Sequence, residues 1–376
     1  MPQTILDDPD GTLAMLRDSA ATLASRRPGP ASLRAKRAGS ADIDRDLWNS
    51  MAEAGWLGLL LPEDLGGAGL GLAEQAVLSE ALGRALIAEP VGAGAVFAST
   101  MLRDAPASAE RDRLAAGLAS GELLVSPAWQ DPSRHSHGAA LKAVADGDDI
   151  ILTGDRHFVD GATSAADFLV VVDAGREALV VSVPAGRSGI SVSEKAGVDG
   201  SAIGRVTFER CSVGASRVIA RGPSIESLVE NAVTNARIAI AAELAGIASK
   251  AVEMTIAYTK DRVQFGRPIA SFQAVQHRLV EMWSDAEFAC ASVVNAVVKQ
   301  SEDDDKAAHL AVLAAKARCG DAATSICRRA VHLHGAMGFT DEHDIGLYLK
   351  RAIALSATLG QPEAMRLEFV ELEHAA

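Results

Sequence analysis

Residues 262–269, with the sequence R-V-Q-F-G-R-P-I, combine a group that can hold an anion with a break in a helical pattern. Arg262 is permanently charged and can bond two oxygens of an anion at once. Gly266 and Pro268 interrupt two long alanine-rich helical segments, which is typical of a connection between two helices. The same residues admit a second interpretation, a plain helix corner in which Arg262 is solvated and Phe265 fills the core.

A second turn rich in glycine lies at residues 330–339, A-V-H-L-H-G-A-M-G-F. Gly335 and Gly338 let backbone amides approach an anionic group closely, and a nearby helix N-terminus would add partial positive charge. A glycine cap at the end of a helix explains Gly335 without any ligand. His332 and His334 are two residues apart, so on a helix they point to different faces, and we expect no metal site here.

The elements that position these residues change type twice along the chain. Helical spacing runs through residues 1–25 and, interrupted by a glycine-rich loop after Gly55, from residue 42 to about 120. The Pro- and Arg-rich segment 26–38 is predicted to be a loop. Short β-branched runs separated by Gly, Asp and Pro then predict antiparallel strands, and long helical segments follow to the end. We predict an α+β fold of three domains: an N-terminal helical domain at 1–120, a middle antiparallel β-barrel at 121–222 and a C-terminal four-helix bundle at 223–376.

Composition limits the classes of partner. Asp and Glu outnumber Lys and Arg, 49 to 36, for a net charge of −13, which argues against nucleic acid. The four cysteines are widely spaced and form no metal-ligand pattern, so we expect reduced thiols in a cytoplasmic protein. No secretory leader and no apolar run long enough to span a bilayer is visible, so we expect no membrane partner.

The stretch R-V-Q-F-G-R-P-I followed by S-F-Q-A-V-Q-H, and the later H-L-H-G-A-M-G-F-T-D-E, resemble the signatures of the acyl-CoA dehydrogenase family of FAD flavoproteins. The order of helices, β-domain and helices also matches that family along essentially the whole chain. The resemblance implies a dimer or tetramer in which these segments reach a neighbouring subunit's FAD. The implied cofactor-binding residues are Arg262, Gln264, Phe265, Gln273, His332, Gly335 and Gly338. Ala336 stands where the family has a second glycine.

Two further segments resemble parts of the family's active site. Residues 154–162 resemble the strand that faces the flavin, which implies that Phe158 packs on the flavin ring, while Asp160 stands where a Thr often bonds it. Residues 126–132 resemble the loop that lines flavin and thioester but lack its Gly-Ser-Asp end. On the long helix, the resemblance implies that Arg237 lies close to the thioester. Thr234 stands at the usual substrate-contacting Asp.

The catalytic base of the family is missing from both of its usual positions. Dehydrogenation of an acyl-CoA needs a carboxylate to remove the α-proton while hydride leaves the β-carbon. By the resemblance, the two positions for this Glu are occupied by Leu359 and Ala236. Glu243 is a remaining candidate on the same helix face, about 10 Å away by helical rise. A buried Glu paired with a neighbouring helix explains Glu243 as well, and we expect Arg351 to pair with Glu342.

The leading hypothesis is therefore α,β-desaturation of a CoA thioester by an FAD flavoprotein, which passes electrons to an acceptor such as an electron-transfer flavoprotein. One alternative is a non-catalytic, FAD-binding partner subunit in a heteromeric, steroid-type acyl-CoA dehydrogenase whose paralogue carries the base. The other alternative is a different flavin reaction on the same fold, such as an oxygenation.

Overall fold

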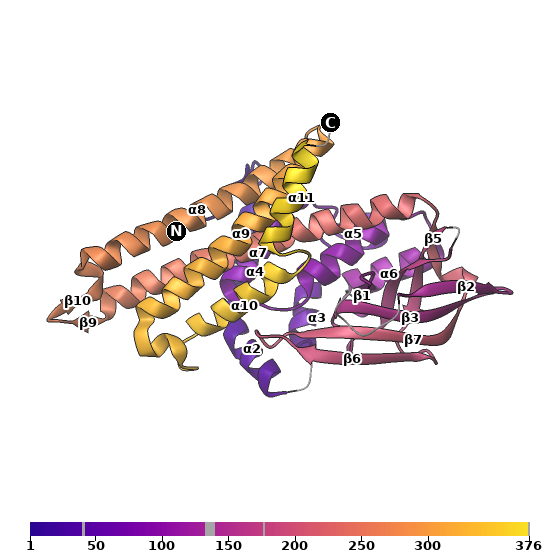
Figure 1. Ribbon diagram of the computed structural model, residues 1–376, viewed down its shortest axis with the longest axis horizontal. Coiled ribbons are helices and arrows are strands. Elements are labelled where there is room, and N and C mark those ends of the chain that lie inside the picture. The colour runs from indigo at the N-terminus through magenta and orange to yellow at the C-terminus, as the bar shows by residue number, and fades with distance from the viewer. Residues whose placement is uncertain (40–41, 132–139, 176, 375–376) are drawn as a thin grey trace. The chain divides into compact units, whose positions relative to one another are not determined.

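A computed structural model describes the chain at residues 1–39, 42–131, 140–175 and 177–374. The α-helices are α1 Thr12–Arg26, α2 Gly29–Ala38, α3 Arg45–Glu53, α4 Leu72–Ala85, α5 Phe97–Asp104, α6 Ala109–Ala119, α7 Ser224–Asp261, α8 Gln273–Lys299, α9 Asp305–His334, α10 Ile345–Ala357 and α11 Pro362–His374 (Figure 1). The strands are β1 Val125–Ala128, β2 Lys142–Asp146, β3 Asp149–Asp160, β4 Asp167–Asp173, β5 Ala178–Pro184, β6 Ile190–Ala196, β7 Ala202–Gly214, β8 Val218–Arg221, β9 Val263–Gln264 and β10 Arg267–Pro268. The predicted succession of helices, strands and helices is confirmed.

The segment predicted as a Pro- and Arg-rich loop contains helix α2, so that prediction is wrong. Pro30 lies in the first turn of α2, where a missing amide hydrogen costs no helical hydrogen bond. Gly29 is required by packing, because a Cβ at this position would lie 2.2 Å from the carbonyl oxygen of Leu86. Proline content alone therefore misidentified a helix start as a loop.

The strands β1 to β8 form one sheet in the order β6-β7-β3-β2-β4-β5-β8, with β1 beside β4. All pairings between these strands are antiparallel except those of β4 with β1 and with β2. Alternate residues of the strands enter a common core that includes Leu152, Phe168, Val181 and Phe208. The register of β3 against β7 shifts between Arg156 and Val159, which is the place where Phe158 lies.

The chain forms two compact units. One consists of Met1–Ala35, Leu72–Ala88 and Arg237–Ala376, and the other consists of Lys36–Gly71 and Glu89–Ala236. The three-domain division at about residues 120 and 222 stays a prediction beside these units.

Two glycines fix the crossing of α4 and α7 in the first unit. A Cβ at Gly83 would lie 2.1 Å from the carbonyl oxygen of Glu243, and one at Gly246 would lie 2.0 Å from that of Glu80. Only glycine permits backbones to approach this closely. The crossing therefore holds two buried carboxylic acids, Glu80 and Glu243, at fixed positions in the unit.

Helix α9 is the central element of the C-terminal helices, because it packs against α8, α10 and α11. Figure 1 shows α8 and α9 running side by side. Within the described ranges, no helix combines the length and the apolar character that crossing a membrane requires.

Candidate functional site

The connection between α7 and α8 is a β-hairpin of β9 and β10, which pair antiparallel. The two residues at its tip, Phe265 and Gly266, have φ of 54° and 77°. Positive φ at both central positions gives the two-residue turn whose twist matches a hairpin. A plain helix corner is therefore the wrong interpretation of this stretch.

The side chains of this hairpin face solvent. Phe265 is 92% exposed, so the interpretation in which it fills the core is wrong. Its ring meets the ring of Phe272 edge-on with centroids 6.2 Å apart, and the Arg267 guanidinium lies 4.2 Å above Phe272. The other exposed members of the predicted cofactor set here are Arg262, Gln264 and Gln273. An exposed ring beside a guanidinium and two amides suits a ligand that has both a flat ring and phosphate.

The second glycine turn ends α9. Gly335 has φ of 60°, and its N–H donates to the carbonyl oxygen of His332, so the interpretation of Gly335 as a helix cap is right. A Cβ at Gly335 would meet nothing within 4 Å, whereas one at Gly338 would lie 2.5 Å from the carbonyl oxygen of Val331. Gly338 is thus needed for packing, while Gly335 and His332 are exposed.

Tyr258 and His334 join the hairpin and the glycine turn. Their rings are stacked with centroids 4.3 Å apart, and the Tyr258 hydroxyl donates to the His334 carbonyl oxygen at 3.1 Å. Tyr258 precedes Arg262 by one helical turn, and His334 directly precedes Gly335. The structure therefore brings together, within one unit, the two segments that the sequence singled out.

His334 is almost completely buried in this cluster, with 1% of its surface exposed. Its Nδ1 lies 2.7 Å from the carbonyl oxygen of Ala330, and its Nε2 is buried with no hydrogen-bond partner. The His343 ring lies 4.4 Å away, and burial lowers the pKa of both imidazoles. In the described part of the chain, no three His, Cys, Asp or Glu side chains are arranged to hold a metal ion.

Residues 356–360, which we call the Leu359 loop, comprise the last two residues of α10 and the three residues that follow it. They include one of the two positions at which the sequence resemblance places the base. Leu359 has φ of 54° and Gly360 has φ of 115°. Lys316 of α9 is fully buried, and its Nζ donates to the carbonyl oxygens of Ser356 and Gly360, each at 3.0 Å. Burial lowers the pKa of Lys316 to about 8. A cation at the carbonyl end of α10 is favourably placed for the helix dipole.

Arg237 holds the same loop from α7. Its Nε donates to the Leu359 carbonyl oxygen at 3.1 Å, and its two terminal nitrogens lie 3.3 Å from the Glu368 carboxylate on α11. The Glu368 carboxylate also lies 3.1 Å from His309 Nε2. The predicted thioester contact Arg237 is therefore engaged with the loop and with α11. Ala236, the other position at which the sequence resemblance places the base, is fully buried in α7 and carries no carboxylate.

Glu243 is buried and paired with Arg351 of α10 at 2.8 Å. The sequence alternative of a buried Glu paired with a neighbouring helix is thus right. The expected pairing of Arg351 with Glu342 is wrong, because Glu342 is exposed whereas the Arg351 guanidinium is buried beside Glu243. The Glu243 carboxylate is thus engaged by the Arg351 guanidinium within the chain.

In the second unit, the bulge in β3 exposes Phe158. The register shift against β7 leaves Phe158 outside the ladder with φ of 56° and 52% of its surface exposed. Bulges redirect side chains in this way. The sequence assigned Phe158 to a flavin-facing position, and the aromatic ring is presented to solvent.

The 126–132 segment is tied to this strand, although Pro132 lies outside the described residues. Trp129 stacks on Phe97 with centroids 5.4 Å apart, and Gln130 forms a β-bridge with His157. Asp131 pairs with Arg156. The Asp131 carboxylate of this segment is thus engaged within the chain.

Two residues of the site were not found from the sequence. Lys316 is a lone lysine in the alanine-rich run A-V-L-A-A-K-A, and a charged residue on an otherwise apolar helix face was the available signal. Glu368 lies on an exposed-looking C-terminal helix, and nothing in its local sequence indicates that it reaches Arg237.

Comparisons with known proteins agree over most of the chain. The model of the acyl-CoA dehydrogenase N-terminal domain matches residues 11–122, and that of the C-terminal domain matches residues 227–371. Acyl-CoA dehydrogenase IpdE2 of Mycobacterium tuberculosis is 30% identical over 329 residues, which cover 86% of this chain and 86% of that protein.

Solved structures match the fold over nearly the full length. A variant of the Tcur3481-Tcur3483 steroid ACAD has a TM-score of 0.84 and 30% identity, covering 96% of this chain and 97% of that one. The ChsE4-ChsE5 complex from Mycobacterium tuberculosis has a TM-score of 0.87 and 26% identity, covering 99% and 100%.

Proposed function

The chain belongs to the acyl-CoA dehydrogenase family, and from this premise we infer that it is an FAD-dependent oxidoreductase that desaturates a CoA thioester between its α and β carbons. The observation that carries the inference is the exposed hairpin, which retains Arg262 and Phe265 with both side chains directed away from the core. At 92% exposure, the Phe265 ring is fully available for contact with another molecule.

The residues of both segments fit FAD. Arg262 would bond the pyrophosphate, because its guanidinium can engage two oxygens at once. Phe265 would contact a ring, and Gln264 and Gln273 would bond polar edges. Gly335 borders open space, where a side chain on any other residue would stand between the backbone and the cofactor. We propose the same contact role for His332, Gly338 and, in the second unit, Phe158.

Bound FAD would accept the hydride that leaves the β-carbon. The chain's own residues must then bind the thioester and take the α-proton, and neither Leu359 nor Ala236 can accept a proton. We propose that the Leu359 loop still shapes the thioester site, with Arg237 and Lys316 fixing its backbone. Proton acceptance then falls to a carboxylate outside the two usual positions, and Glu243 is disfavoured by its pairing with Arg351.

We propose that the protein is a homo-oligomer, a tetramer or at least a dimer. Helix α8 presents Val280, Trp283 and Phe288 with 42–64% of their surfaces exposed. Large apolar side chains gathered on one element mark an association surface. An oligomer would also bring the hairpin of one copy to the cofactor of another.

The missing carboxylate favours one alternative function, that of an FAD-binding partner subunit in a heteromeric, steroid-type acyl-CoA dehydrogenase. The matched ChsE4-ChsE5 structure is a complex, and another matched structure is a steroid ACAD. In that case a paralogue would supply the base. Co-expression with candidate paralogues separates the two functions, because only the alternative requires the second chain for turnover.

Electron delivery and location complete the proposal. We propose that reduced flavin is reoxidised by an acceptor such as an electron-transfer flavoprotein. We also propose a cytoplasmic location, because all four cysteines are free and buried, as in proteins of reducing compartments.

The reaction class is tested by prolonged incubation of the FAD-loaded protein with saturated CoA thioesters and an artificial electron acceptor. Straight-chain, branched and polycyclic acyl groups, deuterated at the α and β carbons, are compared by mass spectrometry. We expect loss of one deuterium atom from each carbon, as a deuteron from the α-carbon and as deuteride from the β-carbon. An oxygenated product, or thioester recovered unchanged by a protein whose absorbance spectrum shows bound FAD, would overturn the proposal.

A further inference from the structure

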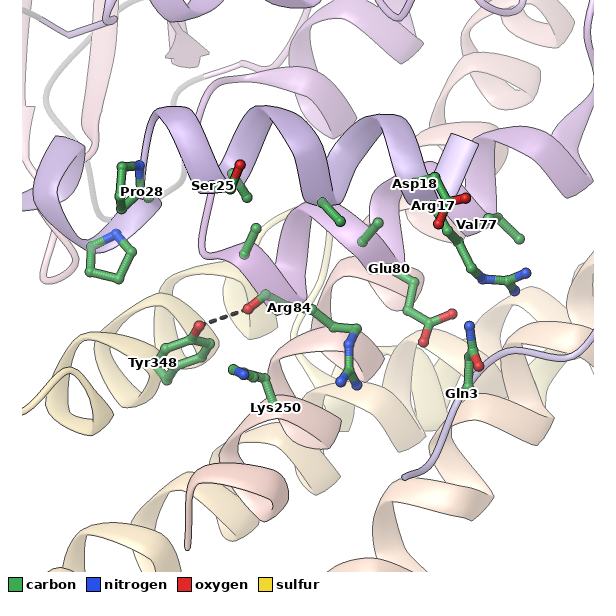
Figure 2. Close-up of a pocket in the computed structure, with 16 residues that line it drawn as sticks. Gln3, Arg17, Asp18, Ser25, Pro28, Val77, Glu80, Arg84, Lys250 and Tyr348 are labelled. Atoms are coloured by element: carbon green, nitrogen blue, oxygen red, sulfur yellow. Dashed lines mark hydrogen bonds between the residues drawn. The ribbon is translucent and has the colours of Figure 1, made fainter. Parts of the chain in front are cut away.

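A cavity of about 560 Å³ lies in the first unit, away from the residues assigned to cofactor and thioester. Its walls come from α1, the start of α2, α4, α7 and α10 (Figure 2). The volume is in the range of small-molecule sites, which run from about 300 to 1,000 Å³. None of the residues proposed to hold FAD or thioester lines it.

The floor of the cavity is apolar and made of small side chains. Helix α4 contributes Val77, Ala81 and Ala85 at a spacing of four residues, and α1 contributes Ala21 and Ala24. Residues at these spacings lie on one helix face. Because the side chains are small, the two faces leave room between them for an aliphatic chain.

One end of the cavity is cationic. Arg17, Arg84 and Lys250 line it. Arg84 and Lys250 both pair with the single carboxylate of Glu253, at 2.5 and 2.6 Å, and Arg17 donates to the neutral carbonyl oxygen of Thr4. The lining also includes the carboxyl side chains of Asp18 and Glu80, and each guanidinium can bond two oxygens of a carboxylate at once.

Glu80 lies at the same end with an unsatisfied oxygen. It is 1% exposed, its Oε2 accepts from the Thr4 N–H at 3.0 Å, and its Oε1 is buried without a partner. Figure 2 shows the carboxyl group among the side chains of Arg17, Arg84 and Gln3. Burial raises the pKa of Glu80, against the lowering effect of Arg17 and Arg84. A protonated Glu80 would donate to a ligand oxygen, which satisfies the buried group.

We propose that this cavity binds an amphiphilic carboxylate, with its head group between Arg17, Arg84 and Glu80 and its apolar tail along the alanine-rich floor. The head would receive hydrogen bonds from guanidinium groups and from the carboxyl group of Glu80. Pro28 and Tyr348 also line the cavity, and the Tyr348 hydroxyl donates to the Arg84 carbonyl oxygen at 2.7 Å. This proposal is independent of the reaction that the protein catalyses.

The two tyrosines of the chain make a direct test possible, because Tyr348 lines the cavity and Tyr258 lies in the cluster with His334. Both are replaced by 3-fluorotyrosine in the full-length protein, and the Tyr348→Phe variant assigns the two ¹⁹F resonances. Sodium decanoate is the probe, and decyltrimethylammonium is the matched cationic probe. We expect decanoate to shift the Tyr348 resonance and to leave the Tyr258 resonance unchanged. The shift should be half-saturated at about 0.1 mM decanoate, as expected for a ligand of this size.

Three variants locate the binding. Arg17→Gln should raise the half-saturation concentration about tenfold, since it removes a charge-assisted bond, and Ala81→Phe should abolish the shift by filling the floor. Arg26→Gln removes an exposed arginine from the same helix outside the cavity and should change nothing. A Tyr348 resonance that does not move, equal response to decyltrimethylammonium, or an effect of Arg17→Gln no greater than that of Arg26→Gln would overturn the proposal.

Discussion

The hairpin at Phe265 and the Leu359 loop have the same backbone feature in opposite surroundings. Each places a non-glycine residue at φ of 54° directly before a glycine that also has positive φ. Phe265 is exposed and its ring meets that of Phe272, whereas the Leu359 loop is held by Arg237 and Lys316 from two helices. Positive φ is costly for both side chains, so each conformation is maintained by its context.

The two regions differ in the side chains that they carry. The hairpin keeps the side chains that would touch FAD and presents them outward. The Leu359 loop has a strained backbone held by the buried Lys316 and by Arg237, and it carries a leucine at the position where the sequence resemblance places a base. If the loop shapes the thioester site as we propose, adding a carboxylate at position 359 should supply the reacting group.

The largest expected effect comes from adding that carboxylate. Leu359→Glu should increase the rate of flavin reduction by a CoA thioester about 10²–10⁴-fold, which is the usual worth of a positioned general base. Stopped-flow absorbance measures it. Leu359→Gln is the matched control, because the Gln side chain has nearly the same shape as Glu and cannot take the proton. Equal rates for the two variants would mean that the loop does not face the thioester.

The hairpin is tested next through Arg262. Arg262→Ala should weaken FAD binding by about 10- to 100-fold, because a charge-assisted bidentate contact contributes about 1.5–3 kcal/mol. Fluorescence titration of apoprotein with FAD measures this. Arg366→Ala removes an exposed arginine that pairs with Asp321 on the bundle, and it should leave FAD affinity unchanged. If the two variants bind FAD equally, the hairpin does not hold the cofactor.

Lys316 should make the free energy of unfolding depend on pH in a direction that can be derived. Its folded-state pKa of about 8 lies below its ordinary value of 10.5, so above pH 8 the unfolded chain binds more protons than the folded one. Relative to Lys316→Met, wild-type stability should therefore rise between pH 8 and 10.5, by on the order of 1–3 kcal/mol. Urea unfolding at several pH values measures the difference. If the difference in unfolding free energy between wild type and Lys316→Met does not change with pH, the pKa of Lys316 is not lowered in the folded protein.

The smallest effect is expected at the hairpin tip. Phe265→Ala should change the free energy of unfolding by less than about 0.5 kcal/mol, because an exposed side chain contributes little to the fold. The same variant should lose FAD more readily on gel filtration. A large loss of stability in the absence of FAD would mean that Phe265 packs within the subunit.

The sequence was sufficient for the succession of elements and for the long helices, because helical and strand periodicity extends over many residues there. Helix α2 was missed because Pro30 is harmless in a first turn. The hairpin was missed because four strand residues give no periodic signal. The pairing of Arg351 with Glu243 joins residues 108 positions apart, and no local pattern indicates which distant carboxylate a buried arginine meets.

Candidate site residues could be selected from the sequence only where they lie close together in one short motif. Arg262, Gln264 and Phe265 could be selected from one short stretch, and they lie on one exposed hairpin. Lys316 donates to backbone carbonyl oxygens of a loop 40 to 44 residues away. Because every residue type has a backbone carbonyl, the loop's own sequence does not indicate this contact. Such contacts become visible only when the helices are packed.

The central claim is that the protein holds the cofactor through its hairpin and lacks a base in its Leu359 loop. Anaerobic mixing of the FAD-loaded, wild-type homo-oligomer with saturating straight-chain, branched and polycyclic CoA thioesters tests it most directly. Bleaching of the flavin absorbance should be about 10²–10⁴-fold slower than for Leu359→Glu with the same thioester. Bleaching by the wild type as fast as, or faster than, that of Leu359→Glu would contradict the claim and show that a base is already in place.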